Sequence, residues 1–184
     1  MQVIVSLLRG VNVGRHARIS MDALRALYES LGFKGARTYV QSGNVVFRTR
    51  ERDLARLEEQ IETAIEGRFG FPCAVILRTA DQMRAVAAQN PFAGRSEVIG
   101  GRLLVFFLAG DPAPEALQKV LAIPAEPEEL RIDGSHLYVH FPNGMSQARL
   151  NWPAVDKALG VPMTGRNWNT VTRLLAMAEE MEAG

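Results

Sequence analysis

Two short, continuous apolar runs constrain the fold of this chain most strongly. QVIVSLL spans residues 2–8, and LLVFFL spans residues 103–108. Runs of this length, bounded by turn signals, are typical of strands that are buried on both faces. Each run begins a stretch in which strands and helices are expected in a similar order. We therefore expect two related halves, a repeat of element order rather than of residue identity.

The spacing of apolar residues predicts strand, helix, strand, strand, helix and strand in the first half. These elements are expected at 2–8, 21–31, 36–41, 44–49, 51–68 and 73–77. Ser20 is a suitable N-cap for the first helix, and Ser42-Gly43 is a hairpin signal. A short helix at 80–89 should end before Asn90-Pro91, because proline disfavours helix at the preceding residue.

The second half repeats this order. Its elements are expected at 103–108, 114–121, 129–133, 136–141, 148–159 and 162–167, followed by a terminal helix at 170–182. Gly134-Ser135 predicts a tight hairpin, and Asn169 is the expected cap of the terminal helix.

This order is that of the ferredoxin-like split βαβ unit. The sequence therefore predicts an α+β protein of two tandem ferredoxin-like halves packed as one compact body. We expect the first half at 1–79, a connecting helix and linker at 80–101, and the second half with its terminal helix at 102–184. Because no long flexible linker separates the halves, a single cooperative unfolding transition is expected.

Charge and composition exclude several classes of protein. Twenty-one basic and 20 acidic residues leave a net charge of +1, so overall charge predicts no polyanionic partner. A single cysteine cannot form an internal disulfide. No apolar run is long enough to span a membrane, and the first residues lack the basic region of a signal peptide. These features favour a cytoplasmic protein without a membrane partner.

Five segments resemble a bacterial family of unknown function (domain of unknown function 1697). They are LRGVNVG at 8–14, TYVQSGNVVF at 38–47, NPF at 90–92, LLVFFL at 103–108 and TGRNWNTVTRLL at 164–175. The resemblance implies two tandem ferredoxin-like halves and no established activity, cofactor or substrate. Gln147 departs from it, since a basic residue is expected there; Arg149 follows two residues later.

The sequence context of several other residues favours structural rather than catalytic or metal-binding roles. Cys73 begins an apolar strand with no histidine nearby in sequence, which is typical of a small buried residue. His136 and His140 share one face of a strand, but two ligands do not make a metal site. The acidic residues of the second helix are expected on its solvated face; they are Glu58, Glu59, Glu62 and Glu66. We expect no metal, flavin, haem or nicotinamide cofactor.

Topology places a candidate site in the first half. In a ferredoxin-like unit the first strand ends at the edge that carries the hairpin between strands two and three. Loop 9–19, turn 42–44 and the start of the helix at 20 should therefore meet. No acidic residue precedes Asp22, whereas Arg9, Arg15 and Arg18 supply positive charge.

This edge is the expected site of a small anion such as phosphate, a nucleotide or a carboxylate. The expected ligand-binding residues are Arg9, Gly10, Asn12, Gly14, Arg15, Ser42 and Asn44, with Arg166 and Asn167 closing the site from the second half. Two other interpretations stay open: these residue types also stabilise turns locally, and a GC-rich genome enriches arginine without any function.

Three classes of function are compatible with these features. The first is a module that binds a small anion, the second is an enzyme acting on such a ligand, and the third is a module that interacts with protein or nucleic acid. RNA binding on a sheet face is the least favoured. The first strand of each half, at 2–8 and 103–108, is apolar on both faces, which predicts that both faces of the sheet are covered.

Overall fold

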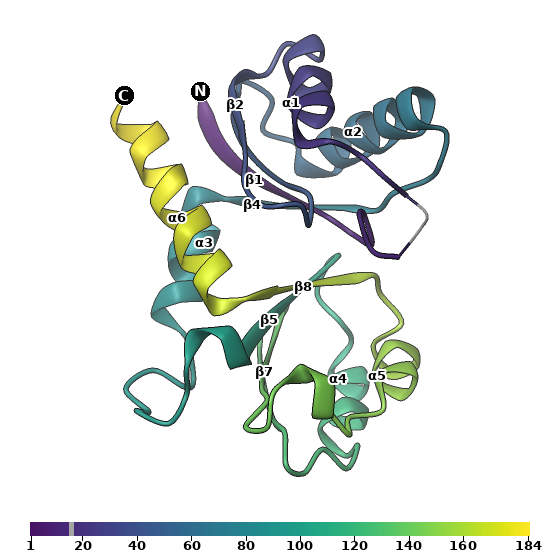
Figure 1. Ribbon diagram of the computed structural model, residues 1–184, viewed down its shortest axis with the longest axis vertical. Coiled ribbons are helices and arrows are strands. Elements are labelled where there is room, and N and C mark those ends of the chain that lie inside the picture. The colour runs from purple at the N-terminus through teal and green to yellow at the C-terminus, as the bar shows by residue number, and fades with distance from the viewer. Residues whose placement is uncertain (15–16) are drawn as a thin grey trace. The chain divides into compact units, whose positions relative to one another are not determined.

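The protein, a computed structural model describing residues 1–14 and 17–184, forms two compact units (Figure 1). Met1–Ala85 and Arg173–Gly184 make up the first unit, and Val86–Thr172 makes up the second. Each unit contains one four-stranded antiparallel sheet. Among the described residues, no helix has both the length and the apolar character needed to cross a membrane.

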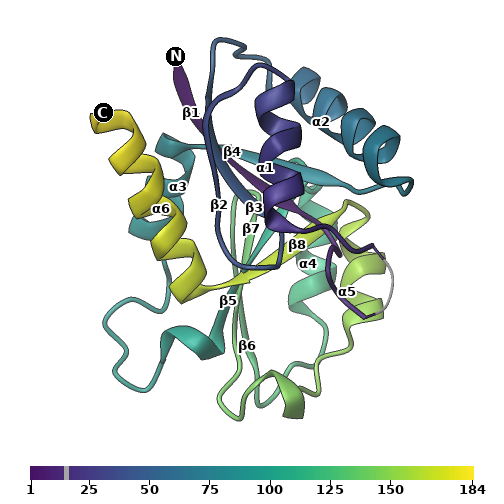
Figure 2. The ribbon, with the colours of Figure 1, turned by 45° about the horizontal axis from the view of Figure 1, so that its top comes forward.

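The first unit has the element order predicted for the first half. In chain order it contains β1 (Gln2–Leu8), α1 (Met21–Ser30), β2 (Lys34–Thr38), β3 (Asn44–Thr49), α2 (Leu54–Phe69), β4 (Val75–Thr79) and the start of α3 (Ala80–Ala88). The strand order is β2-β3-β1-β4, and β1 is antiparallel to both of its neighbours. Helices α1 and α2 lie side by side on one face of the sheet (Figure 2). This is the ferredoxin-like arrangement.

The core of the first unit lies between the sheet and these two helices. Alternate residues of the central strands face it, and the apolar stripes of α1 and α2 cover them. Its fully buried members include Ile4, Leu8, Leu24, Tyr28, Val45, Phe47, Leu57, Ile61 and Ile65. The Tyr28 hydroxyl lies 2.7 Å from Ser6 Oγ, which satisfies both polar groups inside the core. Burial raises the pKa of Tyr28 far above its usual value.

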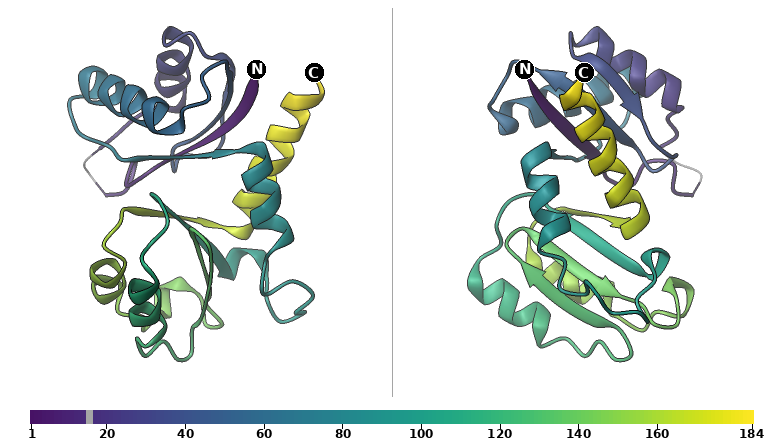
Figure 3. Two further views of the ribbon diagram at one scale, coloured as in Figure 1. Left: turned by 180° about the vertical axis from the view of Figure 1, so that it is seen from behind. Right: turned by 90° about the vertical axis from the view of Figure 1, so that its left-hand side faces the viewer.

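The second unit repeats the arrangement. It contains β5 (Leu103–Leu108), α4 (Pro114–Leu121), β6 (Glu129–Asp133), β7 (His136–His140), α5 (Trp152–Leu159), β8 (Met163–Asn167) and the start of α6 (Trp168–Ala183), with short 3-10 helices at Gly100–Arg102 and Met145–Gln147. The strand order is β6-β7-β5-β8. Helices α4 and α5 lie on one face of this sheet (Figure 3). The predicted fold class, α+β with two ferredoxin-like halves, is confirmed.

The strand registers of the two sheets correspond residue by residue. Val5 lies between Val46 and Arg78, and Val105 lies between Tyr138 and Arg166. A residue of β1 therefore corresponds to the residue one hundred positions later in β5. The two halves correspond in backbone pairing and not in residue identity. A comparison of their residues therefore does not reveal the correspondence.

The end of helix α6 groups with the first unit, whereas the sequence placed the whole helix in the second half. The Arg48 guanidinium donates to the backbone carbonyl of Met181. Arg84 of α3 forms ion pairs with Glu179 and Glu182. These contacts join residues 95 to 133 positions apart, so no local pattern indicates them.

Several details of the predicted elements are wrong, among them the start of α5, which is Trp152 rather than residue 148. The predicted strand 36–41 ends as β2 at Thr38, and residues 39–43 form the connection to β3. Asn167, not Asn169, caps α6: its Oδ1 accepts a hydrogen bond of 2.9 Å from the Thr170 N–H. Asn169 instead lies so close to Gly100 that a Cβ on that glycine would clash with it.

Candidate functional site

Loop 9–19 and turn 42–44 meet at one edge of the first sheet, as topology predicts. The N–H of Leu8 donates to the carbonyl of Gly43 at 2.9 Å. The Asn12 side chain donates across to the carbonyl of Gln41 at 2.8 Å. A Cβ built on Gly43 would lie 2.5 Å from Val11 Cγ2, so the two loops are in direct contact. The predicted convergence is confirmed.

Asn12 holds the first loop together. Its Nδ2 donates to the carbonyl of Ile19 at 2.8 Å as well as to that of Gln41, and its Oδ1 accepts from the Ile19 N–H at 3.0 Å. Its backbone N–H donates to the carbonyl of Ala17 at 2.9 Å, and its φ of 58° lies in the left-handed region that asparagine tolerates. These bonds explain the asparagine at position 12 as a residue that stabilises the turn.

Asn44 and Ser42 hold the second loop. Asn44 is fully buried, and its Nδ2 donates to the carbonyl of Tyr39 at 2.8 Å and to Ser42 Oγ at 3.1 Å. The Tyr39 N–H donates to the Asn44 carbonyl at 3.1 Å. Asn44 is therefore a structural residue of the loop, whereas the Ser42 side chain stays at the surface.

The exposed groups at this edge are mainly basic or backbone groups. Arg9 follows β1, its backbone N–H donates to the carbonyl of Ala74 at 2.9 Å, and its side chain is exposed. Gly10, Gly14 and Arg18 are exposed as well. Arg15 lies outside the described residues.

Helix α1 begins next to this loop. Ser20 caps it, since Ser20 Oγ accepts a hydrogen bond of 3.2 Å from the Ala23 N–H. The first turn of a helix carries unpaired N–H groups and a partial positive charge, which favour an anion nearby. The edge thus combines exposed arginines, exposed glycine backbone and a helix start, within loops that hydrogen bonds hold in place.

Arg166 and Asn167 belong to β8 of the second unit. Arg166 is buried, and its Nη1 donates to Thr164 Oγ1 at 2.8 Å and to the Gly165 carbonyl at 2.9 Å. Asn167 caps α6. That Arg166 and Asn167 close the site from the second half remains a prediction.

The other candidates take structural positions. Cys73 is buried, and its thiol lies 3.5 Å from the Arg9 carbonyl. His136 packs edge-on against Phe107, with ring centroids 5.4 Å apart. Within the described ranges, no three histidine, cysteine, aspartate or glutamate side chains are grouped as metal ligands.

The expectation that the acids of α2 form a solvated face is wrong for two of them. Glu58 Oε1 accepts from the Leu77 N–H at 3.0 Å, and Glu62 Oε1 accepts from the Val75 N–H at 2.8 Å. Since β4 lies at the sheet edge, these carboxylates bond to N–H groups on its open side. Partial burial raises the pKa of Glu58.

Sequence reasoning missed a polar cluster in the second unit. Arg95 donates two hydrogen bonds of 2.8 Å to the Glu129 carboxylate, and its guanidinium lies 5.2 Å from the ring centre of Phe92. The Arg95 guanidinium lowers the pKa of Glu129 to about 2. His140 Nδ1 is 3.5 Å from Glu129 Oε1, and its buried Nε2 has no hydrogen-bond partner among the residues that the structure describes.

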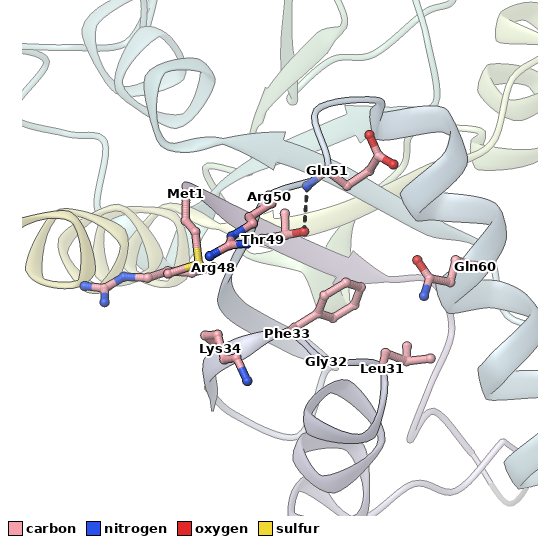
Figure 4. Close-up of a pocket in the computed structure, with 10 residues that line it drawn as sticks. All are labelled: Met1, Leu31, Gly32, Phe33, Lys34, Arg48, Thr49, Arg50, Glu51 and Gln60. Carbon is pink, nitrogen blue, oxygen red and sulfur yellow. Dashed lines mark hydrogen bonds between the residues drawn. The ribbon is translucent and has the colours of Figure 1, made fainter.

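A cavity of about 520 Å³ at the opposite end of the first sheet was also missed (Figure 4). It is lined by Met1, Leu31, Gly32, Phe33, Lys34, Arg48, Thr49, Arg50, Glu51 and Gln60. Three segments separated in sequence form it together with Met1, so no single motif could have indicated it.

One solved structure agrees with the fold, and none of the comparisons with known proteins names an activity. A conserved bacterial protein from Streptococcus pneumoniae has a similar structure, with a TM-score of 0.77 and 22% identity, over 96% of this chain and 98% of that one. An unknown protein from Galdieria sulphuraria aligns with a TM-score of 0.28 and 15% identity, over 90% of this chain and 98% of that one. A search of curated proteins found no match. A family model described as "Protein of unknown function (DUF1697)" matches residues 1–138, and the chain therefore belongs to this family.

Proposed function

We propose that this protein binds a small anionic ligand, such as phosphate, a nucleotide or a carboxylate, at the edge formed by loops 9–19 and 42–44. The exposed guanidinium of Arg9 is the observation that carries the proposal. It forms no ion pair with any residue that the structure describes, and it follows the central strand directly.

Comparison of the two units supports a role for Arg9 beyond folding. The Arg9 N–H donates to the Ala74 carbonyl at 2.9 Å, and in the second unit the Ala109 N–H donates to the Pro162 carbonyl at 2.8 Å. The same fold therefore accepts alanine where the first unit has arginine. Since an arginine at this place is not needed to form the turn, its charge is available for a ligand.

The surrounding backbone suits an anion. Gly10 has a φ of 71° and is exposed, so its backbone can approach a ligand without a side chain in between. Asn12 and Asn44 fix the two loops before any ligand arrives, which lowers the entropic cost of binding. Arg18 supplies further positive charge. The roles of Arg15, Arg166 and Asn167 stay predictions from the sequence.

A thermal-shift experiment with inorganic phosphate, AMP and citrate tests the proposal. At least one of these anions should raise the melting temperature, and Arg9→Ala should abolish that rise. Without ligand the variant should melt close to the parent protein, because an exposed arginine typically contributes no more than about 0.5 kcal/mol to stability. Turnover of the bound anion would show that the site is catalytic.

Arg68→Ala is the matched control, since Arg68 is an exposed arginine at the end of α2. It should leave the ligand-induced rise unchanged. A rise that survives in Arg9→Ala contradicts the site. A sharp fall in the melting temperature of ligand-free Arg9→Ala would instead make Arg9 a structural residue.

A further inference from the structure

The cavity of Figure 4 lies at the end of the first sheet that is remote from loops 9–19 and 42–44. Its walls come from the link between α1 and β2, from the end of β3, and from Gln60 of α2. Strand β1 begins at this end and reaches the loop edge only at Leu8. The cavity shares no lining residue with the proposed anion site, so the two can be tested separately.

The floor of the cavity is apolar. Phe33 is only 6% exposed and stacks on Phe47, with ring centroids 4.4 Å apart and planes inclined by 27°. Leu31 packs against the same core. A ligand in the cavity would therefore meet a fixed aromatic and aliphatic surface.

The rim of the cavity is basic. Lys34 and Arg48 are directly paired residues of β2 and β3. The Arg48 side chain extends away from Lys34 towards α6 (Figure 4), where it donates to the Met181 carbonyl, so Lys34 and Arg50 are the basic residues available to an anion in the cavity. Arg50 lines the cavity and also a second cavity of about 430 Å³, and Arg52 is another lining residue of that second cavity.

The acidic residue of the lining does not neutralise this rim. Glu51 Oε1 accepts from the N–H groups of Arg52 and Asp53 at 2.8 and 3.1 Å, and its Oε2 pairs with Arg56 at 3.3 Å. Arg48 donates to the backbone carbonyl of Met181 in the last turn of α6, so its charge interacts with the partially negative end of that helix. Lys34 and Arg50 form no ion pair within the part of the chain that the structure describes.

We infer that this cavity is a second binding site, for a small organic anion whose phosphate or carboxylate group is attached to a flat apolar body. The anionic group lies at Lys34 and Arg50, and the apolar body lies on Phe33 and Leu31. A volume of about 520 Å³ is in the range of small-molecule sites and is much larger than inorganic phosphate alone requires.

Isothermal titration calorimetry with 1-naphthyl phosphate, 1-naphthoate and inorganic phosphate tests this inference. We expect at least one naphthyl compound to bind, and inorganic phosphate to bind much more weakly at this site because it makes no contact with the floor. The stronger of the two naphthyl compounds identifies the preferred anionic group. The double variant Lys34→Ala/Arg50→Ala should weaken binding about tenfold or more, as expected for the loss of charge-assisted hydrogen bonds.

Two controls separate this site from the loop edge and from general charge effects. Arg25→Ala/Arg68→Ala removes two exposed basic residues from α1 and α2 outside the cavity lining and should leave naphthyl binding unchanged. Arg9→Ala should also leave it unchanged, whatever happens at the loop edge. The inference fails if neither naphthyl compound binds, if the Lys34/Arg50 variant binds as tightly as the parent, or if Arg9→Ala abolishes binding.

Discussion

Glu129 of β6 forms an ion pair with Arg95, and this pair joins the segment 90–100 to the second sheet. The two hydrogen bonds from Arg95 stabilise its ionised form and hold its pKa near 2, below the usual 4.5. The folded protein therefore binds fewer protons at Glu129 than the unfolded chain does. The resulting stabilisation is complete above the unfolded pKa of about 4.5 and is lost as the pH falls towards 2.

Replacing Glu129 should accordingly matter at neutral pH and not in strong acid. We expect Glu129→Gln to lower the free energy of unfolding by about 1 kcal/mol at pH 7, a modest loss because the Glu129 side chain is 33% exposed and screened by water. The difference from the parent should shrink steadily below about pH 4.5. Urea unfolding across this pH range measures it, and Glu59→Gln, at an exposed position in the middle of α2, is the control. A difference that stays constant with pH would contradict the assigned pair.

Residue types at the loop edge could be predicted from the sequence, but their roles could not. Asn12 and Asn44 bond to backbone carbonyls of residues 19, 39 and 41, whose positions depend on how the two loops meet. Arg9 is also polar, so the sequence alone does not distinguish its role from that of the two asparagines, but in the structure Arg9 is exposed. Only the fold separates an amide that holds a loop from a cation that faces solvent.

At the scale of elements, most strands and helices could be predicted because their apolar spacing is local. The α2 carboxylates show the limit of that reasoning. Glu58 and Glu62 directly follow the buried residues Leu57 and Ile61, so they flank the buried stripe, but helical spacing does not show that the N–H groups of β4 lie within their reach. The basic cavity was missed for the same reason, since its walls come from separate elements.

The turn between β2 and β3 offers a test of how tightly the two loops pack. Gly43 has a φ of 77°, and a Cβ there would lie 2.5 Å from Val11 Cγ2 and 2.9 Å from Leu8 Cβ. Gly134, in the hairpin between β6 and β7, also has a positive φ, of 52°, but open space around it. We expect Gly134→Ala to cost about 1 kcal/mol from backbone strain, and Gly43→Ala to cost about 2–4 kcal/mol because strain and overpacking add. Urea unfolding of both variants measures the difference, and equal losses would contradict the predicted contact.

At the scale of the whole molecule, the chain passes between its two units twice, each time within a helix. The first boundary, between Ala85 and Val86, falls inside α3, and the second, between Thr172 and Arg173, falls inside α6. A helix is a cooperative element, so the loss of one unit would disturb the helix that continues into the other. This arrangement favours the single unfolding transition expected from the sequence.

The location of the tryptophans allows that expectation to be tested. Both, Trp152 and Trp168, lie in the second unit, so their fluorescence reports on that unit. Ile61 is fully buried in the core of the first unit, and Ile61→Ala should destabilise it by about 2–5 kcal/mol. If the units unfold together, the urea midpoint followed by tryptophan fluorescence should fall by the same amount as the midpoint followed by circular dichroism, and calorimetry should show one peak. Gln60→Ala, at the exposed neighbouring position, should move neither midpoint appreciably. An unchanged tryptophan midpoint in Ile61→Ala, together with a second calorimetric peak, would show that the two units unfold independently.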